Sequence, residues 1–535
     1  MNDTTTYRLA DHAAAEPLIN RWVAWPHVFS PVPYSLHMAN YQRQTLASYL
    51  QNPAIHAKSC RNPKLLGGPF VDVPVDRANE VRALLDELEQ NHQAESALAQ
   101  AVIAFQHTLV EEAQGQGINA YYEKIPEPLG GYVELLYDYF ARPHLRCLES
   151  LLYASPYYQK GLQALQLFSQ TSDDERAYYM STPRLPQADR IDWTLPFEDQ
   201  RIDALFQLDS VPAPLGEIRE LLGLSRADDA RLLPLLTDEP AGLAEPWRGE
   251  GVRLRYFGHA CVLLEYHGVA ILTDPFIPVL PRAGGIERYS FRDLPARIDF
   301  VLISHAHHDH FVFESLLRLR HRIGCLVVPR SSGMFYGDTS LKLMAQHIGF
   351  REVREIDALE EIPFPGGAIV GAPFFGEHSD LPHAKSGYIV RHGQERILFA
   401  ADSNCLDPRV YRHVCGLLGP IGTVFLGMEF IGAPLSWVYG PLLPMQPQHS
   451  HNLSRRSNGS DAKAALALLD AVGAERVYVY AIGREPWLKY FMALTPQDGD
   501  PYIQESDQLL DAARASGFKD ARRPYGRLEL HLGGA

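Results

Sequence analysis

Residues 299–310 read DFVLISHAHHDH, and this stretch decides which fold the chain adopts. An apolar run typical of a buried strand leads directly into His305, His307, Asp309 and His310. Imidazole nitrogens and carboxylate oxygens are common ligands of divalent transition metals. Alternation at the strand end turns His305 and His307 to one side, and the following turn brings Asp309 and His310 towards a second position. The spacing predicts ligands for two adjacent metal ions and disfavours a polar turn with incidental histidines.

The segment TDEPAGLAEPWRGE, residues 237–250, separates two regions whose residue patterns differ. Its prolines, glycines and charges are typical of a linker, so we expect one domain over residues 1–245 and another over 246–535. Residues 77–114 carry apolar positions at helical spacing, which predicts one or two long amphipathic helices. We therefore expect a mainly helical (α+β) N-terminal domain with an accessory or dimerisation role. The alternative is that its aromatic side chains wall the substrate pocket.

After this boundary, short apolar runs alternate with helical segments. The runs include VRLRYF, CVLLEY, VAILTD, DFVLISH, CLVVP, GYIVR, RILFAAD and TVFLGME, and the helical segments include FESLLRLRHR and DAKAALALLDAV. Strands that alternate with helices predict a layered α/β architecture for the C-terminal half.

The composition is that of a globular enzyme, with 46 % apolar and 21 % charged residues. A net charge of −15 argues against binding to nucleic acid or to an anionic membrane surface. The cysteines form no CxxC pair, so we expect neither a disulfide framework nor a cysteine zinc site. The first residues carry acids without an apolar core, and no apolar run approaches the roughly 20 residues of a membrane span. We therefore expect a cytoplasmic protein.

Two dipeptides extend the metal-binding pattern. A Gly-His pair ends at His259, and an Asp-Pro pair begins at Asp274, each after an apolar run. Together with residues 305–310 they resemble the metallo-β-lactamase superfamily, over roughly residues 250–490. The resemblance implies an αββα sandwich, in which two sheets carry helices on their outer faces. It also implies that Asp274 supports the ligands from a second layer and that His259 is structural.

The superfamily supplies its remaining ligands from later strand ends. Asp402 follows the run RILF and matches the bridging carboxylate, with a buried or helix-capping aspartate as the alternative. The motif GEHSD offers either Glu377 or His378 as a ligand. Hydrolases of this fold close the shell with a histidine after a late strand, but the matching run at 477–483, VYVYAIG, has none. With Glu377 as the ligand, three imidazoles and three carboxylates would form an open, oxygen-rich shell that suits iron better than zinc.

Longer stretches point to one branch of this superfamily. They include WVAWPHVFSP (22–31), LYASPYY (152–158), FFGEHSDL (374–381), FLGMEFIGAPLSWVYGPL (425–442) and VYVYAIGREPW (477–487). Over nearly the whole chain the sequence resembles the dinuclear-iron β-hydroxylases of nonribosomal peptide pathways, which include the amino-acid β-hydroxylase of chloramphenicol biosynthesis. In that family the glutamate of GEH is an iron ligand and no terminal histidine is used, which favours Glu377 over His378.

The resemblance implies a non-haem diiron monooxygenase. Its substrate would be an amino acid tethered as a thioester to the carrier (thiolation) domain of a nonribosomal peptide synthetase, and its product the β-hydroxy amino acid. The cofactor would be two iron ions with oxo or hydroxo bridges, dioxygen would be the co-substrate, and an external reductase would supply electrons. One ion would be held by His305, His307 and Glu377, the other by Asp309 and His310, with Asp402 between them. A homodimer built through the N-terminal half is expected from the family.

Three more residues are candidates for substrate contacts. Glu429 ends the run TVFLGM, where its carboxylate would hold the substrate amine or relay a proton, with a carboxylate bonded to backbone as the alternative. Arg455 and Arg456 are candidates for the phosphopantetheine phosphate or an acidic carrier helix, with a solvated basic turn as the alternative. A zinc hydrolase of the same fold, acting on a lactone, phosphodiester or amide, is the competing function, and a ligand role for His378 would favour it.

Overall fold

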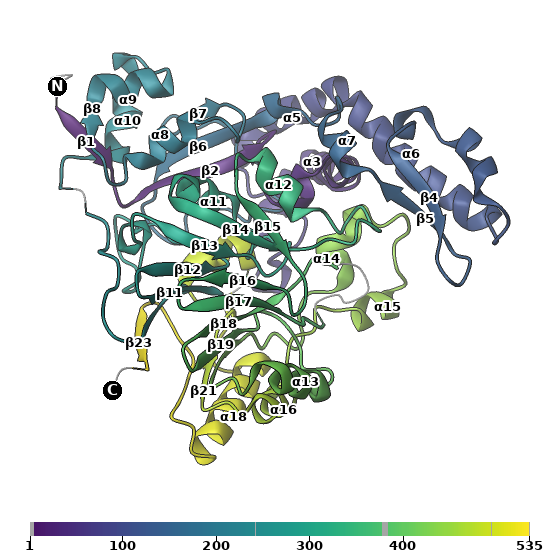
Figure 1. Ribbon diagram of the computed structural model, residues 1–535. Helices are drawn as coiled ribbons and strands as arrows, with labels where there is room; N and C mark the ends of the chain where they lie inside the picture. The colour runs from purple at the N-terminus through teal and green to yellow at the C-terminus, as the bar shows by residue number, and fades with distance from the viewer. Residues whose placement is uncertain (1–4, 241, 377–382, 494, 534–535) are drawn as a thin grey trace.

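The computed structural model describes residues 5–240, 242–376, 383–493 and 495–533. The C-terminal half is a sandwich of two seven-stranded sheets (Figure 1). One sheet has the strand order β15-β14-β13-β12-β11-β10-β23, and the other has the order β16-β17-β18-β19-β20-β21-β22. Their facing sides bury an apolar core that includes Leu254, Ile271, Val390 and Phe425. This core is continuous because each strand contributes alternate apolar side chains to it.

The strands of the first sheet are β10 (Val252–Gly258), β11 (Cys261–Tyr266), β12 (Val269–Thr273), β13 (Ile298–Leu302), β14 (Ile323–Pro329), β15 (Val353–Ile356) and β23 (Leu528–Leu532). Those of the second are β16 (Glu361–Phe364), β17 (Gly367–Ala372), β18 (Gly387–His392), β19 (Glu395–Phe399), β20 (Thr423–Leu426), β21 (Arg476–Val479) and β22 (Asp520–Arg522). Strands β12 to β15 pair in parallel, as do β19 to β22. The parallel strands are buried on both faces, which explains their nearly continuous apolar sequences.

Helices cover the outer face of each sheet. The first sheet carries α11 (Phe313–Leu319) and α12 (Leu341–His347), and the second carries α13 (Pro408–Leu418), α16 (Ala462–Val472) and α18 (Pro501–Ala515) (Figure 1). The predicted αββα sandwich is therefore confirmed.

The N-terminal half combines many helices with small antiparallel sheets, which confirms the expected mainly helical (α+β) class. Residues 77–114 form two helices, α5 (Ala78–Asn91) and α6 (Gln93–Glu112), which meet at His92. The other helices are α1 (Pro26–Phe29), α2 (Pro31–His37), α3 (Arg43–Gln51), α4 (Pro53–Cys60), α7 (Glu149–Tyr153), α8 (Arg201–Gln207), α9 (Leu215–Leu222) and α10 (Asp229–Leu232). The strands are β1 (Thr6–Leu9), β2 (Ala13–Ile19), β3 (Trp22–Val23), β4 (Val133–Tyr137), β5 (Pro143–Cys147), β6 (Gln163–Ser169), β7 (Ile191–Thr194), β8 (Ala213–Pro214) and β9 (Leu236–Thr237).

The N-terminal half packs on α11 as a further layer over the sandwich (Figure 1). Arg318 of α11 donates to both carboxylate oxygens of Asp209, at 2.9 and 2.6 Å, and to the Ala13 carbonyl at 2.7 Å. The rings of Phe29 and Phe313 lie 5.2 Å apart in the same layer. One apolar core thus continues from the N-terminal half to the first sheet.

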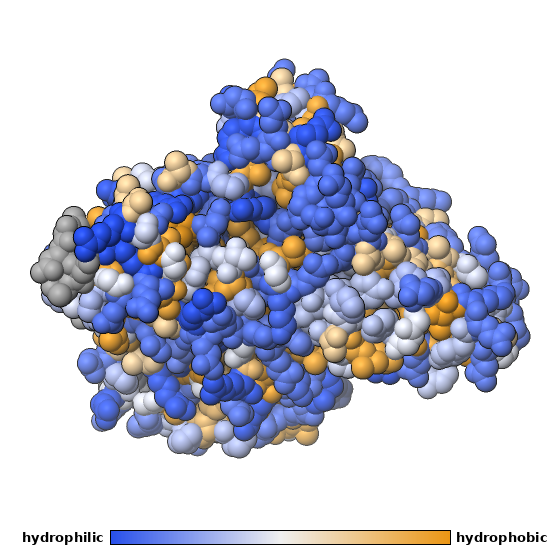
Figure 2. Space-filling view, turned by 90° about the horizontal axis from the view of Figure 1, so that it is seen from above, coloured by the Kyte–Doolittle hydropathy of each residue, from blue (hydrophilic) through white to orange (hydrophobic). Residues whose placement is uncertain are grey.

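The face of the molecule seen in Figure 2 is mostly hydrophilic. Figure 2 shows apolar side chains there only in small groups between charged and polar ones, as is usual for a globular protein. Among the helices of the described residues, none is long and apolar enough to cross a membrane.

Candidate metal centre

The predicted ligands lie where parallel strands of both sheets end. Asp274 follows β12, the histidine motif follows β13, and Asp402 follows β19. The carboxyl ends of parallel strands meet at one edge, so residues far apart in sequence converge there. His259 and Asp274 take positive φ angles of 49° and 30°, a conformation that is uncommon for non-glycine residues and that often occurs at functional sites.

Two groups of potential ligand atoms form at this edge. In the first, His305, His310 and Asp402 place one ligand atom each within 4.8 Å of the others. His310 Nε2 lies 3.2 Å and His305 Nε2 lies 3.8 Å from Asp402 Oδ2. In the second, Asp309 Oδ2 lies 3.7 Å from His310 Nε2 and 2.9 Å from Nε2 of His259. His310 belongs to both groups, so the two positions are adjacent.

A second layer of polar groups fixes the histidine rings. Asp274 accepts from His310 Nδ1 at 2.9 Å and from the Ser304 amide and hydroxyl at 2.7 Å each. Ser304 Oγ also lies 2.9 Å from His305 Nδ1. Because Nδ1 of both rings is occupied in this way, Nε2 of His305 and of His310 faces Asp402. Asp274 thus lies behind the His310 ring and belongs to neither group of potential ligand atoms.

The other two histidines of the motif contact aromatic side chains. His307 Nε2 lies 3.2 Å from the hydroxyl of Tyr439, although its ring centroid is only 4.7 Å from that of His305. The ring of His308 stacks on Tyr179 and Phe491 at centroid distances of 4.9 and 5.7 Å, and its Nδ1 lies 3.9 Å from Asp309 Oδ1.

The protonation of the site suits a cation. Burial lowers the pKa of His305 well below its usual range and that of His307 to about 4, so both rings are neutral. Burial favours protonation of Asp309, but the His310 and His308 imidazoles hold its pKa well below its usual range. Burial disfavours the charged form of His310, yet Asp402 and Asp309 raise its pKa well above its usual range. The carboxylates therefore draw a positive charge to this position, and a metal ion would supply it.

The residues present fit a pair of metal ions. His305 Nε2 is buried and, among the described residues, has no hydrogen-bond partner. An unsatisfied imidazole nitrogen beside two carboxylates is costly unless a cation occupies the space between them.

Several predicted residues lie outside these groups. Glu377 and His378 lie outside the described residues, so the choice between them stays a prediction. Glu429 is half-buried after β20, and its carbonyl accepts from the Gly459 amide at 2.9 Å. Arg456 donates to the Gly432 carbonyl at 2.9 Å, and Arg455 follows α15 (His449–Ser454). The two metal-binding groups found among the described residues include none of these three side chains.

Three residues that contact the candidate ligands were not predicted as parts of the metal centre. Ser304 joins Asp274 to His305, Tyr439 contacts His307, and His259 bonds Asp309 rather than serving only the fold. The Gly-His motif is the one available signal for His259. Ser304 and Tyr439 carry no motif of their own.

The chain matches known families over both halves. Residues 8–240 match the family described as diiron non-heme beta-hydroxylase N-terminal domain, and residues 253–372 match the beta-lactamase superfamily domain. The match to the first family lies in the N-terminal half. A hydrolase that consists of the second domain alone would have no counterpart of this half.

One relative is similar over its full length. The 4-amino-L-phenylalanyl-[CmlP-peptidyl-carrier-protein] 3-hydroxylase of Streptomyces venezuelae is 34 % identical, covering 98 % of this chain and 100 % of that protein. The crystal structure of CmlA, a diiron beta-hydroxylase from Streptomyces venezuelae, superposes with a TM-score of 0.92 at 33 % identity, over 99 % of this chain and 100 % of CmlA. A CmlA mutant with one glutamate changed to aspartate gives a TM-score of 0.89 at 33 % identity, over 98 % and 100 % of the two chains. On this full-length likeness, the chain belongs to the diiron non-haem β-hydroxylase family.

Proposed function

We propose that this protein is a dinuclear-iron monooxygenase that β-hydroxylates an amino acid held as a thioester on a carrier protein. The observation that carries the proposal is the convergence of His305, His310 and Asp402 in a chain that is similar to a carrier-protein-dependent hydroxylase from end to end. In the balanced reaction, one oxygen atom of dioxygen enters the Cβ–H bond and the other leaves as water, with two electrons and two protons from an external donor.

The ligand set that we propose combines the two groups with residues beyond them. His305, His307 and Glu377 hold one ion, Asp309 and His310 hold the other, and Asp402 lies between them. Bound iron would supply the reductive activation of dioxygen, which no side chain performs. The chain itself keeps the site dry, since His305 and His310 are only 3 % and 0 % exposed. A dry site protects a strong oxidant from side reactions.

The substrate contacts are proposals of the same kind. The half-buried Glu429 is our candidate for the substrate amine, because it follows β20 at the edge that carries the ligands. Arg455 and Arg456 are our candidates for the phosphopantetheine phosphate or an acidic carrier helix, because a positive charge attracts both.

The partners that we propose are the carrier domain of a nonribosomal peptide synthetase, an external reductase and a second copy of the chain. Tyr139 and Phe140, at the tip of the β4–β5 hairpin, are 106 % and 80 % exposed, and such aromatic side chains favour an interface. We assign residues 1–245 to the accessory and dimerisation domain and 246–535 to the catalytic domain. We expect the enzyme in the cytoplasm, where its six free cysteines stay reduced.

The first test is the metal content and absorption of protein from iron-supplied cells. We expect about two irons per chain and a near-ultraviolet charge-transfer band that dithionite bleaches. The loaded protein should then hydroxylate a carrier-bound amino acid with dioxygen and a reductant. Two tightly held zinc ions in a colourless protein that cleaves a lactone, phosphodiester or amide would instead establish the hydrolase.

A further inference from the structure

Tyr439 brings a phenol hydroxyl to the histidine motif from a distant part of the chain. It ends the short helix α14 (Leu435–Tyr439), is 3 % exposed, and places its hydroxyl 3.2 Å from His307 Nε2. A ring whose Nε2 is bonded to a phenol oxygen presents Nδ1 to any other partner. The orientation of His307 therefore depends on where the backbone holds Tyr439.

The N-terminal half holds the segment that carries Tyr439. Asn40 Nδ2 donates to the Pro441 carbonyl at 2.8 Å, from the π-helical turn η1 (Met38–Gln42). Trp437 Nε1 donates to the Gly67 carbonyl at 3.0 Å. π-helical turns are rare and are frequently found at functional sites. Both hydrogen bonds join the N-terminal half to residues within two positions of Tyr439.

His27 of α1 adds a third contact. Its ring lies 5.3 Å from that of Tyr439, and its Nε2 lies 3.2 Å from the Gly337 carbonyl. The next residue towards the N-terminus, Tyr336, donates its hydroxyl to the Leu442 carbonyl at 2.6 Å. Residues 336–337 thus link His27 to the chain that follows Tyr439.

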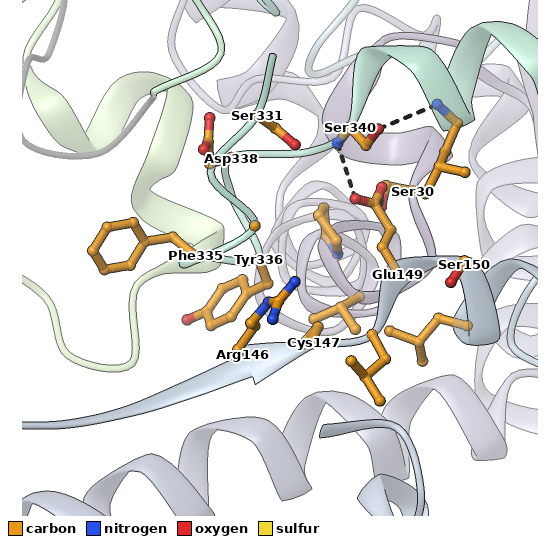
Figure 3. A pocket seen from close by; sticks show the side chains of 16 residues that line it. Ser30, Arg146, Cys147, Glu149, Ser150, Ser331, Phe335, Tyr336, Asp338 and Ser340 are labelled. Atoms are coloured by element: carbon orange, nitrogen blue, oxygen red, sulfur yellow. Dashed lines mark hydrogen bonds between the residues drawn. The ribbon is translucent and has the colours of Figure 1, made fainter. Parts of the chain in front are cut away.

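The loop of residues 331–340 borders a cavity of about 200 Å³ between the two halves of the molecule (Figure 3). Tyr336, Asp338 and Ser340 line one side of it, and Ser30 and Glu149 of the N-terminal half line the other. The Ser340 amide donates to Glu149 at 2.9 Å, and Asp338 accepts from the Ala384 amide at 2.7 Å. The loop is therefore tied to the N-terminal half, to the Tyr439 segment and to the chain just beyond the GEHSD motif.

We propose that Tyr439 is a positioning residue that orients His307 for metal binding and that the N-terminal half holds Tyr439 in place. The N-terminal half then belongs to the metal centre as a structural part of it, in addition to any role in dimerisation. The inference rests on the proposed role of His307 as a ligand. A lost second-layer partner typically weakens metal binding 10–100-fold.

The test compares Tyr439→Phe with Tyr49→Phe in the full-length, metal-loaded protein. Tyr49 is likewise a buried tyrosine, and its hydroxyl donates to the Val73 carbonyl at 3.1 Å within the N-terminal half. Each variant is dialysed against graded chelator, and retained iron and the absorption spectrum are measured beside thermal unfolding. We expect Tyr439→Phe to lose one of two ions at roughly 10–100-fold lower chelator concentration, with an altered spectrum, and Tyr49→Phe to retain both. Asn40→Ala should shift retention in the same direction by a smaller factor.

Two further results decide between the proposals. If His307→Ala loses an ion while Tyr439→Phe retains both as Tyr49→Phe does, the positioning role is wrong and the proposed ligand set stands. If His307→Ala also retains both ions, the ligand assignment of His307 fails and the positioning role with it. Full retention by Asn40→Ala, with loss in Tyr439→Phe, would overturn the part assigned to the N-terminal half.

Discussion

At Asp274 a single carboxylate accepts three hydrogen bonds, two from Ser304 and one from the ring of His310. This network sets the backbone of the histidine motif and the tautomer of His310 together. A negative charge behind the imidazole also makes its Nε2 a better ligand. Asp274 would therefore act on a bound metal ion through the His310 ring, which it contacts directly.

Asp274→Asn should weaken the ion held by His310 about 10–100-fold, because the amide removes that charge and one acceptor. Competition with a coloured chelator measures the change. Asp520→Asn is the control, since that carboxylate accepts from the Tyr478 hydroxyl at 2.8 Å on β22, away from the ligands. Equal affinity in the two variants would contradict the role of Asp274.

Substitutions can distinguish whether Glu377 or His378 is the metal ligand. Glu377→Ala should empty or weaken one metal position, because we assign its carboxylate to the first ion, whereas His378→Ala should keep both ions. Elemental analysis of the two purified variants measures this, and each serves as the control for the other. The reverse pattern would make His378 the ligand and would favour the hydrolase over the monooxygenase as the function.

At the scale of elements, strand ends and tight turns place the ligands. Gly376 precedes the GEHSD glutamate with a φ of +81°, and a Cβ there would lie 2.3 Å from the Asn458 carbonyl oxygen. Lys385 Nζ donates to the Gly376 carbonyl at 2.8 Å, and the Phe375 amide donates to Ser403 next to Asp402. Only glycine can adopt this positive φ angle without strain and also leave room for the Asn458 carbonyl.

Gly376→Ala should lower the free energy of unfolding by about 1 kcal/mol or more and reduce metal content, because the turn must shift. Denaturant unfolding and elemental analysis measure the two effects. Gly422→Ala is the matched control, since a Cβ at Gly422 meets no atom within 4 Å. A variant at Gly376 with the stability and metal content of the control would refute the packing argument.

At the scale of the whole molecule, the junction between the halves contains an acid that responds to pH. Burial raises the pKa of Glu149 to about 7, although the Ser340 amide and the Ser30 hydroxyl partly stabilise its charge. The folded state thus favours the neutral acid. This group contributes most to stability below its ordinary pKa of 4.5, and the contribution is lost as the pH rises through about 7.

Glu149→Gln should therefore become more stable relative to the unsubstituted protein as the pH rises from 5 to 8, because glutamine carries no charge. Its amide oxygen can still accept from the Ser340 amide, and its NH2 group can donate to the Ser30 hydroxyl in place of the bond that Glu149 accepts there. Thermal unfolding at several pH values measures the difference. Glu134→Gln, at an exposed glutamate of the β4–β5 hairpin, should show no such trend. A difference between Glu149→Gln and the unsubstituted protein that stays constant with pH would contradict the argument.

Sequence patterns alone predict the sandwich, and they single out four of the five residues that converge in the two groups of potential ligand atoms, with His259 as the exception. Apolar runs of strand length report burial directly, and His305 to His310 lie so close in the chain that local geometry alone brings them together. Asp274 and Asp402 were recognisable because each follows a strand whose end lies at a predictable edge.

The surroundings of these residues depend on tertiary packing, which the sequence does not reveal. The Tyr439 hydroxyl meets His307 across 132 residues, and Asn40 meets Pro441 across 401. No local pattern encodes such contacts, because they depend on how whole segments pack against each other rather than on spacing within one segment. The hydrogen bond of His259 to Asp309 and the union of the two halves around Tyr439 emerge only once the chain has folded.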